Sequence, residues 1–460
     1  MTFLKKFILI TSIFCLIIHL LLIITEHTSF NYLIFIPLCY AISFICLPKN
    51  ICIGSGTTML LVVSFIRYLI YPILLSIDIS NNTYTPPYNF NTAIGLMCFE
   101  IFIINFSIAI FNKKVEKFQP NINIEKANII PIIACCIYFI IVIIYPEAFA
   151  NKHFIGSPEN MGRSEVKISG VISQIIAWSE FLIITYFFTS FYQKYIIKRR
   201  KRFYYLSILI ILIPCLFFTG SSRLSLLMPL ICSIFFLKKV YPRQSNKIIL
   251  SILTYGIIAI FILSIQKFYG DISSSTIADN SSNSNLRDLL NIYFGGVENI
   301  CIGLNSYESF GSSIEVFIND FLRNAMGISK YFVENPNNSV TIFNRFFYND
   351  FYASEDQICP TIIEGLLMFG PCLCFIPTLI MTFSISWLDR QTAKSNSIQL
   401  IYLYSYVGSL IGWCVPGNLM HLSTAFFNIF IPLYVLSYLN KNKRKKSIYH
   451  TNNTINSQCL

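Results

Sequence analysis

Charged residues are scarce in this sequence. Its 460 residues include only 22 Asp and Glu and 34 Lys and Arg, 12% in all, whereas 55% are hydrophobic and long apolar runs follow one another. A soluble domain carries about twice this share of charged residues. The composition therefore excludes an ordinary soluble fold and indicates a membrane protein.

Motifs for nucleotides and metals are absent as well. The sequence holds neither a Walker motif nor a Rossmann fingerprint, and its cysteines show no zinc or redox spacing. No cluster of carboxylates or histidines calls for a metal. The basic residues sit in short segments between apolar runs, which is an orientation signal rather than a nucleic-acid patch. We expect no cofactor, no metal and no nucleic acid partner.

Twelve apolar windows come close to the 20 or so residues that a helix needs to cross a bilayer core. They lie near residues 7–25, 30–47, 57–77, 92–112, 128–145, 171–191, 203–218, 224–237, 248–265, 361–387, 398–413 and 420–438. The first window follows two lysines as a signal peptide would, but no small-residue cleavage site comes after it, and we expect it to remain as a helix. The predicted fold is all-α, a polytopic integral membrane protein with about 12 transmembrane helices.

The windows divide the chain into four predicted parts. Residues 1–265 form a membrane bundle of nine helices, and residues 361–440 add three more helices. Between them, residues 266–360 are the only long polar interval, and residues 441–460 form a basic tail. A polar interval of this length is more typical of a folded external domain than of a slack linker.

The distribution of basic residues fixes the predicted orientation. With the N-terminus in the cytoplasm, 24 Lys and Arg fall on the inner side and nine on the outer side, and Arg67 alone lies in mid-membrane. By the positive-inside rule both termini are cytoplasmic and the polar interval lies outside. Any chemistry is then expected on the outer face, without ATP or a nucleotide sugar.

Two amphipathic helices are predicted in the polar interval. One covers Leu286 to Phe294; the other follows the capping pattern Ser312 to Glu315, with Ile314, Phe317, Ile318, Phe321, Leu322 and Ala325 at helical spacing. Both lie on the membrane surface, cover a cavity or simply pack against the helix bundle. The aromatic run Phe346 to Tyr352, which includes Tyr348, offers flat faces for sugar rings or forms a membrane-facing belt.

The sequence leaves open whether Cys301 and Cys359 form a disulfide, which requires an oxidising compartment.

Two arginines are the first candidates for binding an anion. Arg67 lies at a depth comparable to Glu100 and Glu180, where it forms a structural ion pair or holds a lipid-linked phosphate. Arg223 follows Gly220 at an external break between two apolar helices, where a lipid pyrophosphate would lie; the alternative is an interfacial anchor.

Further candidates lie on the same outer side. They are the basic residues Arg163, Lys167, Arg287, Arg323 and Arg345. Glu364, just after the polar interval, is a candidate general base for a sugar hydroxyl, or a helix N-terminal acid stabilised by the helix dipole. His153 and His421 are alternative bases.

Two short motifs resemble one family. The segment Phe217 to Leu227 is similar to the Gly-Ser-Arg turn of the Wzy-type O-antigen and oligosaccharide repeat-unit polymerases, and Glu364-Gly365 with Phe369-Gly370 is similar to their Glu-x-x-x-x-Phe-Gly pattern after the large periplasmic loop. The number of helices, the cytoplasmic termini and the late external loop also agree. The paired Arg-x10-Gly loop motifs described for some members are absent.

The resemblance implies an inverting membrane glycosyltransferase with a GT-C-like fold in a bacterial inner membrane. Such an enzyme transfers a glycan from undecaprenyl pyrophosphate to the next lipid-linked repeat unit at the periplasmic face, for O-antigen or a related surface polysaccharide. The resemblance assigns binding of the pyrophosphate to Arg223 and, less directly, to Arg163 and Arg67. Its implied partners are the undecaprenyl-pyrophosphate-linked oligosaccharide and the lipid bilayer, with a chain-length regulator left open.

Two other functions fit the same sequence. An O-antigen ligase shares the fold and the lipid donor but transfers to the lipid A core. A lipid-linked oligosaccharide flippase, which is not an enzyme, also has about twelve helices, but it has short loops and charges inside its bundle, and no repeat is visible between the two halves of this sequence.

Overall fold

The computed structural model describes most of the chain. The described residues are 9–18, 20–21, 31–48, 51–80, 85–112, 129–149, 152–154, 170–215, 217–219, 224–242, 244, 246–256, 258, 286–332, 337–349, 357–413 and 417–439. They form two compact units, each built from segments that are far apart in the sequence. Unit 1 comprises Met1–Glu116, Asn280–Arg390 and Gly408–Ala425, and unit 2 comprises Lys117–Asp279, Gln391–Val407 and Phe426–Leu460.

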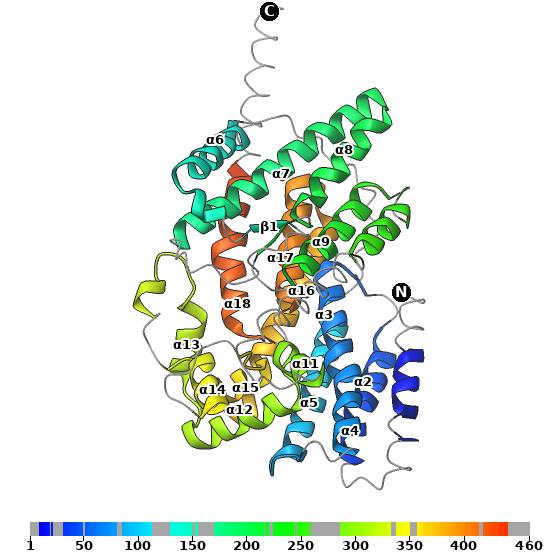
Figure 1. The fold of residues 1–460 in the computed structure, drawn as a ribbon, viewed down its shortest axis with the longest axis vertical. Coiled ribbons are helices and arrows are strands. Elements are labelled where there is room, and N and C mark those ends of the chain that lie inside the picture. Colours follow the sequence, from blue (N-terminus) through cyan, green and yellow to red (C-terminus); the bar gives the residue numbers. More distant parts are fainter. Residues whose placement is uncertain are drawn as a thin grey trace, which may run out of the picture. The chain divides into compact units, whose positions relative to one another are not determined.

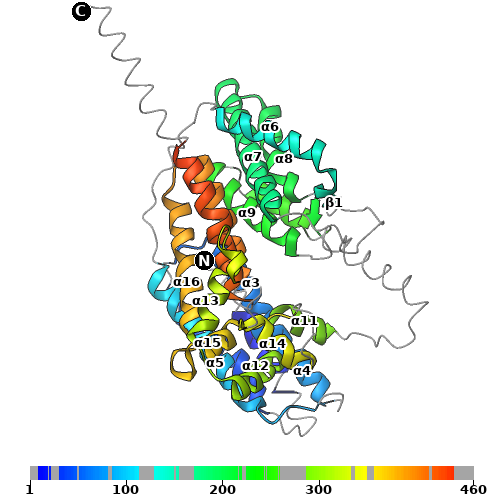
Figure 2. The same cartoon turned by 90° about the vertical axis from the view of Figure 1, so that its left-hand side faces the viewer.

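Unit 1 is helical throughout its described part (Figures 1 and 2). Its elements before the polar interval are η1 (Asn31–Ile34), α2 (Phe35–Cys46), α3 (Ser55–Phe65), the π-helical turn η2 (Ile66–Ile70), α4 (Tyr71–Ser80) and α5 (Phe90–Phe111). The later elements are α11 (Leu286–Phe294), α12 (Val297–Phe310), α13 (Ile314–Leu322), η5 (Ser329–Tyr331), α14 (Ser339–Tyr348), α15 (Thr361–Phe369), η6 (Pro371–Leu373), α16 (Ile376–Lys394) and α18 (Leu419–Ser423).

Unit 2 combines helices with a short ribbon. Its elements are α6 (Ile129–Ile144), η3 (Pro146–Phe149), β1 (Lys152–Phe154), α7 (Gly170–Lys198), α8 (Lys201–Leu212), η4 (Ile213–Cys215), β2 (Phe217–Thr219), α9 (Leu224–Val240), a helix over 246–256, and the π-helical η7 (Thr424–Phe430), which begins in unit 1. The helix α17 (Ile398–Trp413) contributes residues to both units.

The chain is a helical membrane protein. Among the described residues, five helices are long and apolar enough to cross a bilayer: Ser55–Ile79, Phe90–Phe111, Gly170–Lys198, Pro371–Lys394 and Leu419–Leu439. Three shorter apolar helices, Leu9–Ile18, Tyr32–Cys46 and Ile130–Ile144, coincide with further predicted windows. The predicted total of twelve spans therefore stays a prediction.

Two windows differ from their prediction. The window 203–218 contains α8, which ends at Leu212, and then the start of the short strand β2, so it is not one continuous helix. The window 361–387 is interrupted after α15 by Gly370, whose φ of 74° ends that helix, and by Pro371, which starts the next turn. A single hydropathy window cannot resolve such a break, because the residues on both sides of it are mainly apolar.

The polar interval is folded against the apolar helices of unit 1. The predicted helix Leu286 to Phe294 is confirmed as α11, and the second predicted helix is confirmed as α13. Its cap is Ser313, whose hydroxyl accepts the backbone N–H of Glu315 at 3.2 Å. In Figure 2, α12, α14 and α15 lie together beside α5, in agreement with the packing of α12 on all three.

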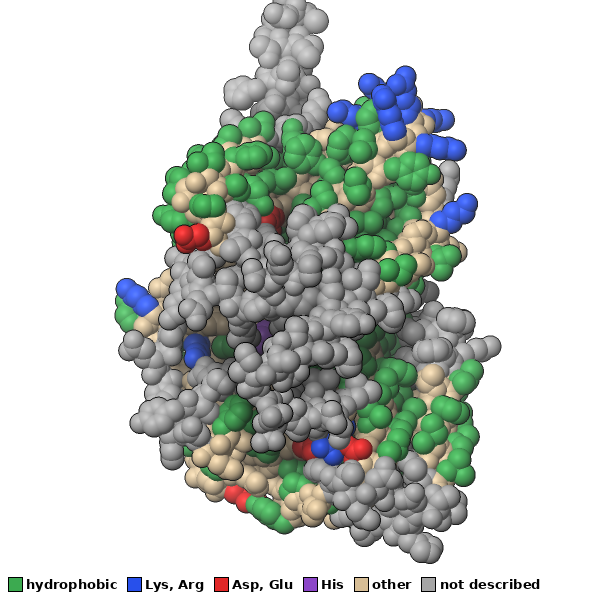
Figure 3. Space-filling view, in the orientation of Figure 1, with side chains coloured by type: hydrophobic (Ala, Val, Ile, Leu, Met, Phe, Trp, Pro, Cys, Tyr) green, Lys and Arg blue, Asp and Glu red, His purple; other side chains and the backbone are tan. Residues whose placement is uncertain are grey.

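The turn between α7 and α8 in unit 2 is strongly basic. Its six basic side chains are all exposed: Lys194, Lys198, Arg199, Arg200, Lys201 and Arg202. They account for the group of Lys and Arg side chains at the end of this hairpin in Figure 3. This turn belongs to the segments that the positive-inside rule assigns to the cytoplasm.

Candidate functional site

Three of the buried acidic side chains in unit 1 lie at the N-termini of α14, α15 and α18. Asp320 of α13 accepts the backbone N–H of Ser339, the first residue of α14, at 3.2 Å. Glu364 of α15 accepts the backbone N–H of Leu419, the first residue of α18, at 2.8 Å. Negative charge is stabilised there by the unpaired N–H groups and the helix dipole.

The third acid is Glu100 of α5. It accepts the backbone N–H of Ile362 in the first turn of α15, and the hydroxyl of Tyr68 donates to its Oε2 at 2.8 Å. We call Glu100, Asp320 and Glu364 the acidic junction. All three side chains have no exposed surface. The junction ties α13, α14, α15 and α18 to α5, so it joins the polar interval to helices that cross the membrane.

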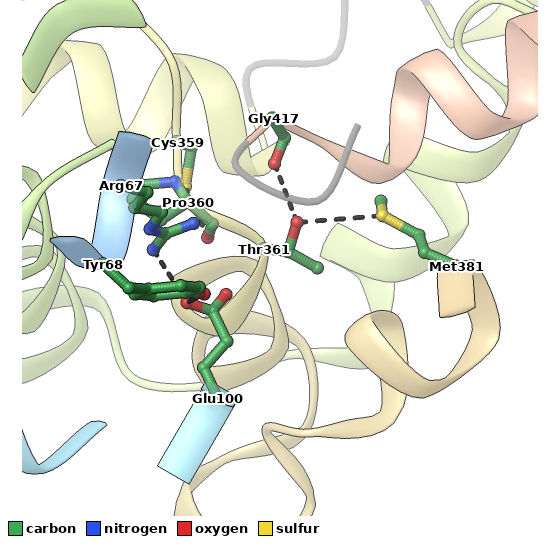
Figure 4. Close-up of polar contacts among 8 residues, drawn as sticks. All are labelled: Arg67, Tyr68, Glu100, Cys359, Pro360, Thr361, Met381 and Gly417. Carbon is green, nitrogen blue, oxygen red and sulfur yellow. Dashed lines mark hydrogen bonds and ion pairs between the residues drawn. The ribbon is translucent and has the colours of Figure 1, made fainter. Parts of the chain in front are cut away.

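Arg67 is the cation of this region. Its Nη2 lies 2.8 Å from Oε2 of Glu100, and the Arg67 side chain is only 1% exposed (Figure 4). The structural pair that the sequence allowed is therefore confirmed with Glu100 as the partner. The Nε and Nη1 atoms of Arg67 have no hydrogen-bond partner in the described structure. Arg67 thus keeps donors for an anion, but it does not reach the surface.

Glu364 has both carboxylate oxygens engaged. Besides Leu419, the hydroxyl of Ser339 donates to Oε1 of Glu364 at 3.1 Å. Glu364 lies outside the five candidate spans, and its burial raises the pKa of its carboxyl well above the ordinary value, with a further contribution from the charge of Asp320. The carboxyl in this position links the first residues of α14 and α18. It does not face a space that an acceptor sugar could enter.

The other residues of the Glu364 to Gly370 motif also have structural roles. A Cβ atom on Gly365 would overlap the backbone carbonyl of Cys374, so only glycine fits where the chain returns after α15. The Phe369 ring lies 5.3 Å from the ring of Phe317 on α13. The positive φ of Gly370 favours glycine. The motif as a whole builds the bend between α15 and α16.

The remaining candidates of unit 1 are spread around this core. Arg287 of α11 pairs with Asp78 of α4 at 2.9 Å. Arg345 is half-buried in the last turn of α14, and Tyr348 at the end of that helix accepts a hydrogen bond from the side-chain amide of Gln357 at 2.9 Å. His421 is exposed, and its backbone N–H donates to the side chain of Asn418, the cap of α18, at 3.2 Å.

Other predictions fall on or near residues outside the described part. Arg163 and Arg223 lie outside it, as do Lys167, Asp350 and the end of the aromatic run. Cys301 and Cys359 are both described, and both are buried free thiols. The disulfide that their sequence positions left open is therefore absent; the Cys359 thiol instead contacts the carbonyl of Pro360.

The β1–β2 ribbon in unit 2 was not predicted. The strands are antiparallel, with Lys152 opposite Thr219 and Phe154 opposite Phe217. In the sequence, β1 precedes the segment that contains Arg163, and β2 directly precedes Gly220. The only sequence signal was the β-favouring run Phe217 to Thr219, which is hidden at the end of an apolar window.

Sequence reasoning also missed Asp320 and Ser339. Asp320 sits among apolar residues of a predicted amphipathic helix, and Ser339 follows Asn338 in a turn signal. The pair Asn338-Ser339 was detectable as a helix start, because asparagine is a favoured N-cap. Its contact with an acid far along the chain was not, because that depends on tertiary packing.

Comparison with known proteins does not assign this chain to a family. No family model, curated protein or solved structure matches this chain. Among the described residues, no group of three or more His, Cys, Asp and Glu side chains is placed to hold a metal ion.

We expect Glu364→Gln to fold and to change the pH dependence of stability. A glutamine oxygen can accept from Leu419, and its amide can donate to the Ser339 hydroxyl. Because the folded pKa of Glu364 is raised, its contribution to stability is full below the unfolded pKa, about 4.3, and is lost as the pH rises through the folded pKa. Thermal unfolding in detergent between acidic and neutral pH should therefore show a smaller loss of stability for Glu364→Gln than for the wild type.

Glu364→Ala is the matched control. It leaves the buried N–H of Leu419 without an acceptor, which costs about 1–3 kcal/mol at any pH. Turnover separates the two roles proposed for this carboxyl. A general base would lose about 10²–10⁴-fold in rate in Glu364→Gln, whereas a structural acid would leave the rate near normal. Equal pH profiles for wild type and Glu364→Gln would contradict the raised pKa.

Proposed function

We propose that the chain is an inverting membrane glycosyltransferase that polymerises undecaprenyl-pyrophosphate-linked oligosaccharide repeat units at the periplasmic face of a bacterial inner membrane. The motifs Gly220 to Arg223 and Glu364 to Gly370 motivate the proposal. The observation that supports it best is the β1–β2 ribbon, because it pairs Lys152–Phe154 with Phe217–Thr219, the strand that directly precedes Gly220 in the sequence. The planar donor fork of an arginine such as Arg223 or Arg163 suits a pyrophosphate.

The reaction needs a cation cluster and a proton acceptor. The acceptor hydroxyl oxygen attacks the anomeric carbon from the face opposite the pyrophosphate; the carbon–oxygen bond to the pyrophosphate breaks, and undecaprenyl pyrophosphate leaves with the bonding electrons. Arg223 and Arg163 would stabilise the charge that develops on this leaving group. The hydroxyl proton passes to a base. Glu364 is fully buried, whereas His421 is exposed at the start of α18. We therefore assign the role of general base to His421.

The polar interval supplies a second argument. Its described helices pack on α5 and on the first turn of α18 rather than forming a loose connection. A flippase has no evident need for such an outer layer, whereas a transferase needs a surface for the acceptor glycan. Tyr348, Arg345 and Arg287 are the residues of this layer that we assign to the glycan or its phosphate.

Arg223→Ala should abolish polymerisation while leaving the protein in the membrane. Loss of one preorganised donor for the leaving group is expected to lower turnover about 10²–10³-fold. Arg223→Lys should recover only part of the rate, since it keeps the charge but loses the planar fork. The measurement is product length with purified protein and lipid-linked repeat unit. Lys201→Ala, which removes an exposed cation elsewhere, serves as the control and should match the wild type.

Cells that lack the gene distinguish the three candidate functions. Loss of a polymerase leaves lipid A core carrying a single repeat unit, whereas loss of a ligase or a flippase leaves core without any. A gel of the lipopolysaccharide reads this directly. Core without repeat units would overturn the polymerase assignment, and wild-type polymer from Arg223→Ala would overturn the role of that arginine.

A further inference from the structure

The helix α13 has its apolar face outward and its polar face inward. Ile314 is 58% exposed and Ile318 is 43% exposed, and both belong to the apolar stripe that sequence periodicity predicted. The buried side chains of the helix are Val316, Asn319 and Asp320. A helix that packs on a protein core in water has the reverse arrangement.

Hydrogen bonds fix this orientation. The side-chain amide of Asn319 donates to the carbonyl of Asn337 at 2.7 Å, and Asp320 accepts the N–H of Ser339. Turning the apolar stripe inward would break both contacts and bring a carboxylate of the acidic junction to the surface. The outward position of Ile314 and Ile318 is therefore a consequence of the fold.

The exposed apolar surface continues past the helix. Met326 is 42% exposed, Ile328 is 41% exposed and Tyr331 is 70% exposed, in the turns that follow α13. The exposed Lys330 ammonium lies 4.9 Å from the centre of the Tyr331 ring. Tyrosine and lysine side chains at the edge of an apolar surface are typical of the boundary between lipid and water.

The same surface lies beside the end of a membrane-crossing helix. The hydroxyl of Ser423 donates to the carbonyl of Phe321, and the amide of Asn324 donates to the hydroxyl of Thr424 at 3.2 Å. Ser423 and Thr424 are in the first turns of the candidate span Leu419–Leu439. The segment from α13 to Tyr331 is thus placed at the level where this span enters the bilayer.

We propose that this surface, formed by Ile314, Ile318, Met326, Ile328 and Tyr331, is immersed in the lipid of the leaflet at the N-terminal end of the Leu419–Leu439 span, with Lys330 at the lipid phosphates. The sequence had left open whether α13 covers a cavity or lies on the membrane, and the outward stripe selects the membrane. The polar interval then includes an interfacial anchor. This goes beyond the proposed function and holds whatever reaction the protein performs.

Tryptophan quenching tests the proposal. Ile318→Trp and Ile314→Trp are compared in lipid nanodiscs with Glu315→Trp, which places the same probe on an exposed polar position of the same helix, at the edge of the apolar stripe. The signal of the native tryptophans, measured on the unmodified protein, is subtracted. Brominated phospholipid reports contact with acyl chains, and iodide reports contact with water.

Immersion predicts that brominated lipid quenches the two stripe positions at least about twofold more strongly than Glu315→Trp, while iodide shows the opposite order. Iodide quenching of Ile314→Trp and Ile318→Trp would show that the surface faces water. Protection of both from either quencher would show that protein covers it. Each of these two results overturns the proposal.

Discussion

Arg67→Met should leave little folded protein. The substitution removes the only charge paired with Glu100 and leaves a carboxylate with no exposed surface inside the bundle. Breaking a buried ion pair from one side costs about 3–5 kcal/mol, a large share of the stability of a typical protein. The yield of monodisperse protein in detergent, followed by its thermal unfolding, measures the effect.

The double variant Arg67→Met with Glu100→Gln is the control. It removes both charges, and the glutamine still offers an oxygen to Tyr68 and to the N–H of Ile362. We expect most of the lost stability to return, because neutral replacement of a buried pair is often close to neutral in free energy. If the double variant is as unstable as Arg67→Met, the ion pair is not the cause.

The double variant also separates structure from binding. The unpaired Nε and Nη1 atoms of Arg67 are available to an anion. A double variant that folds but no longer elongates glycans would give Arg67 a role in substrate binding. A variant that folds and elongates normally would confine Arg67 to its pair with Glu100.

Gly365→Ala should be the other severe change. The added methyl group would overlap the backbone carbonyl of Cys374, and backbone atoms on both sides leave no side chain that can move away. We expect a loss of at least about 3 kcal/mol, the upper end of overpacking effects, or failure to fold. Thermal stability and membrane yield measure it.

Gly95→Ala is the matched control for Gly365→Ala. Gly95 is also helical, in α5, and a Cβ atom there meets nothing within 4 Å. The same substitution should therefore be harmless or add about 0.4–1 kcal/mol through the unfolded chain. Similar stability of the two variants would contradict the close approach of Gly365 to Cys374.

Long apolar runs located the membrane helices, because a helix that faces the bilayer must be apolar over most of its length. Apolar periodicity located the helices of the polar interval. The helix Phe90 to Phe111 was found within two residues of each end, and α11 was found with its full bounds. Breaks inside apolar segments were not found. Gly370 and the strand Phe217 to Thr219 interrupt windows whose hydropathy does not change across the break.

The site was less predictable than the fold. The sequence offered Glu100 and Glu180 as partners for Arg67, because an isolated charge in a membrane helix needs a partner, and the structure shows the pair with Glu100. The contacts of Glu364 with Ser339 and Leu419 join segments 25 and 55 residues apart, and no local pattern records them. The apolar stripe of α13 was identified correctly, but its direction was left open, since periodicity defines a face and does not say whether protein or lipid covers it.

The length of α7 bears on how the protein responds to its bilayer. Its 29 residues span about 44 Å at a rise of about 1.5 Å per residue, whereas a hydrocarbon core is about 30 Å thick. Roughly nine residues are thus in excess, and the exposed lysines and arginines from Lys194 to Arg202 lie at one end of the helix. A thicker membrane would draw apolar residues such as Ile196 and Ile197 into the acyl region while the long basic side chains still reach the phosphates. The helix can therefore accommodate bilayers of different thickness without a change in its tilt.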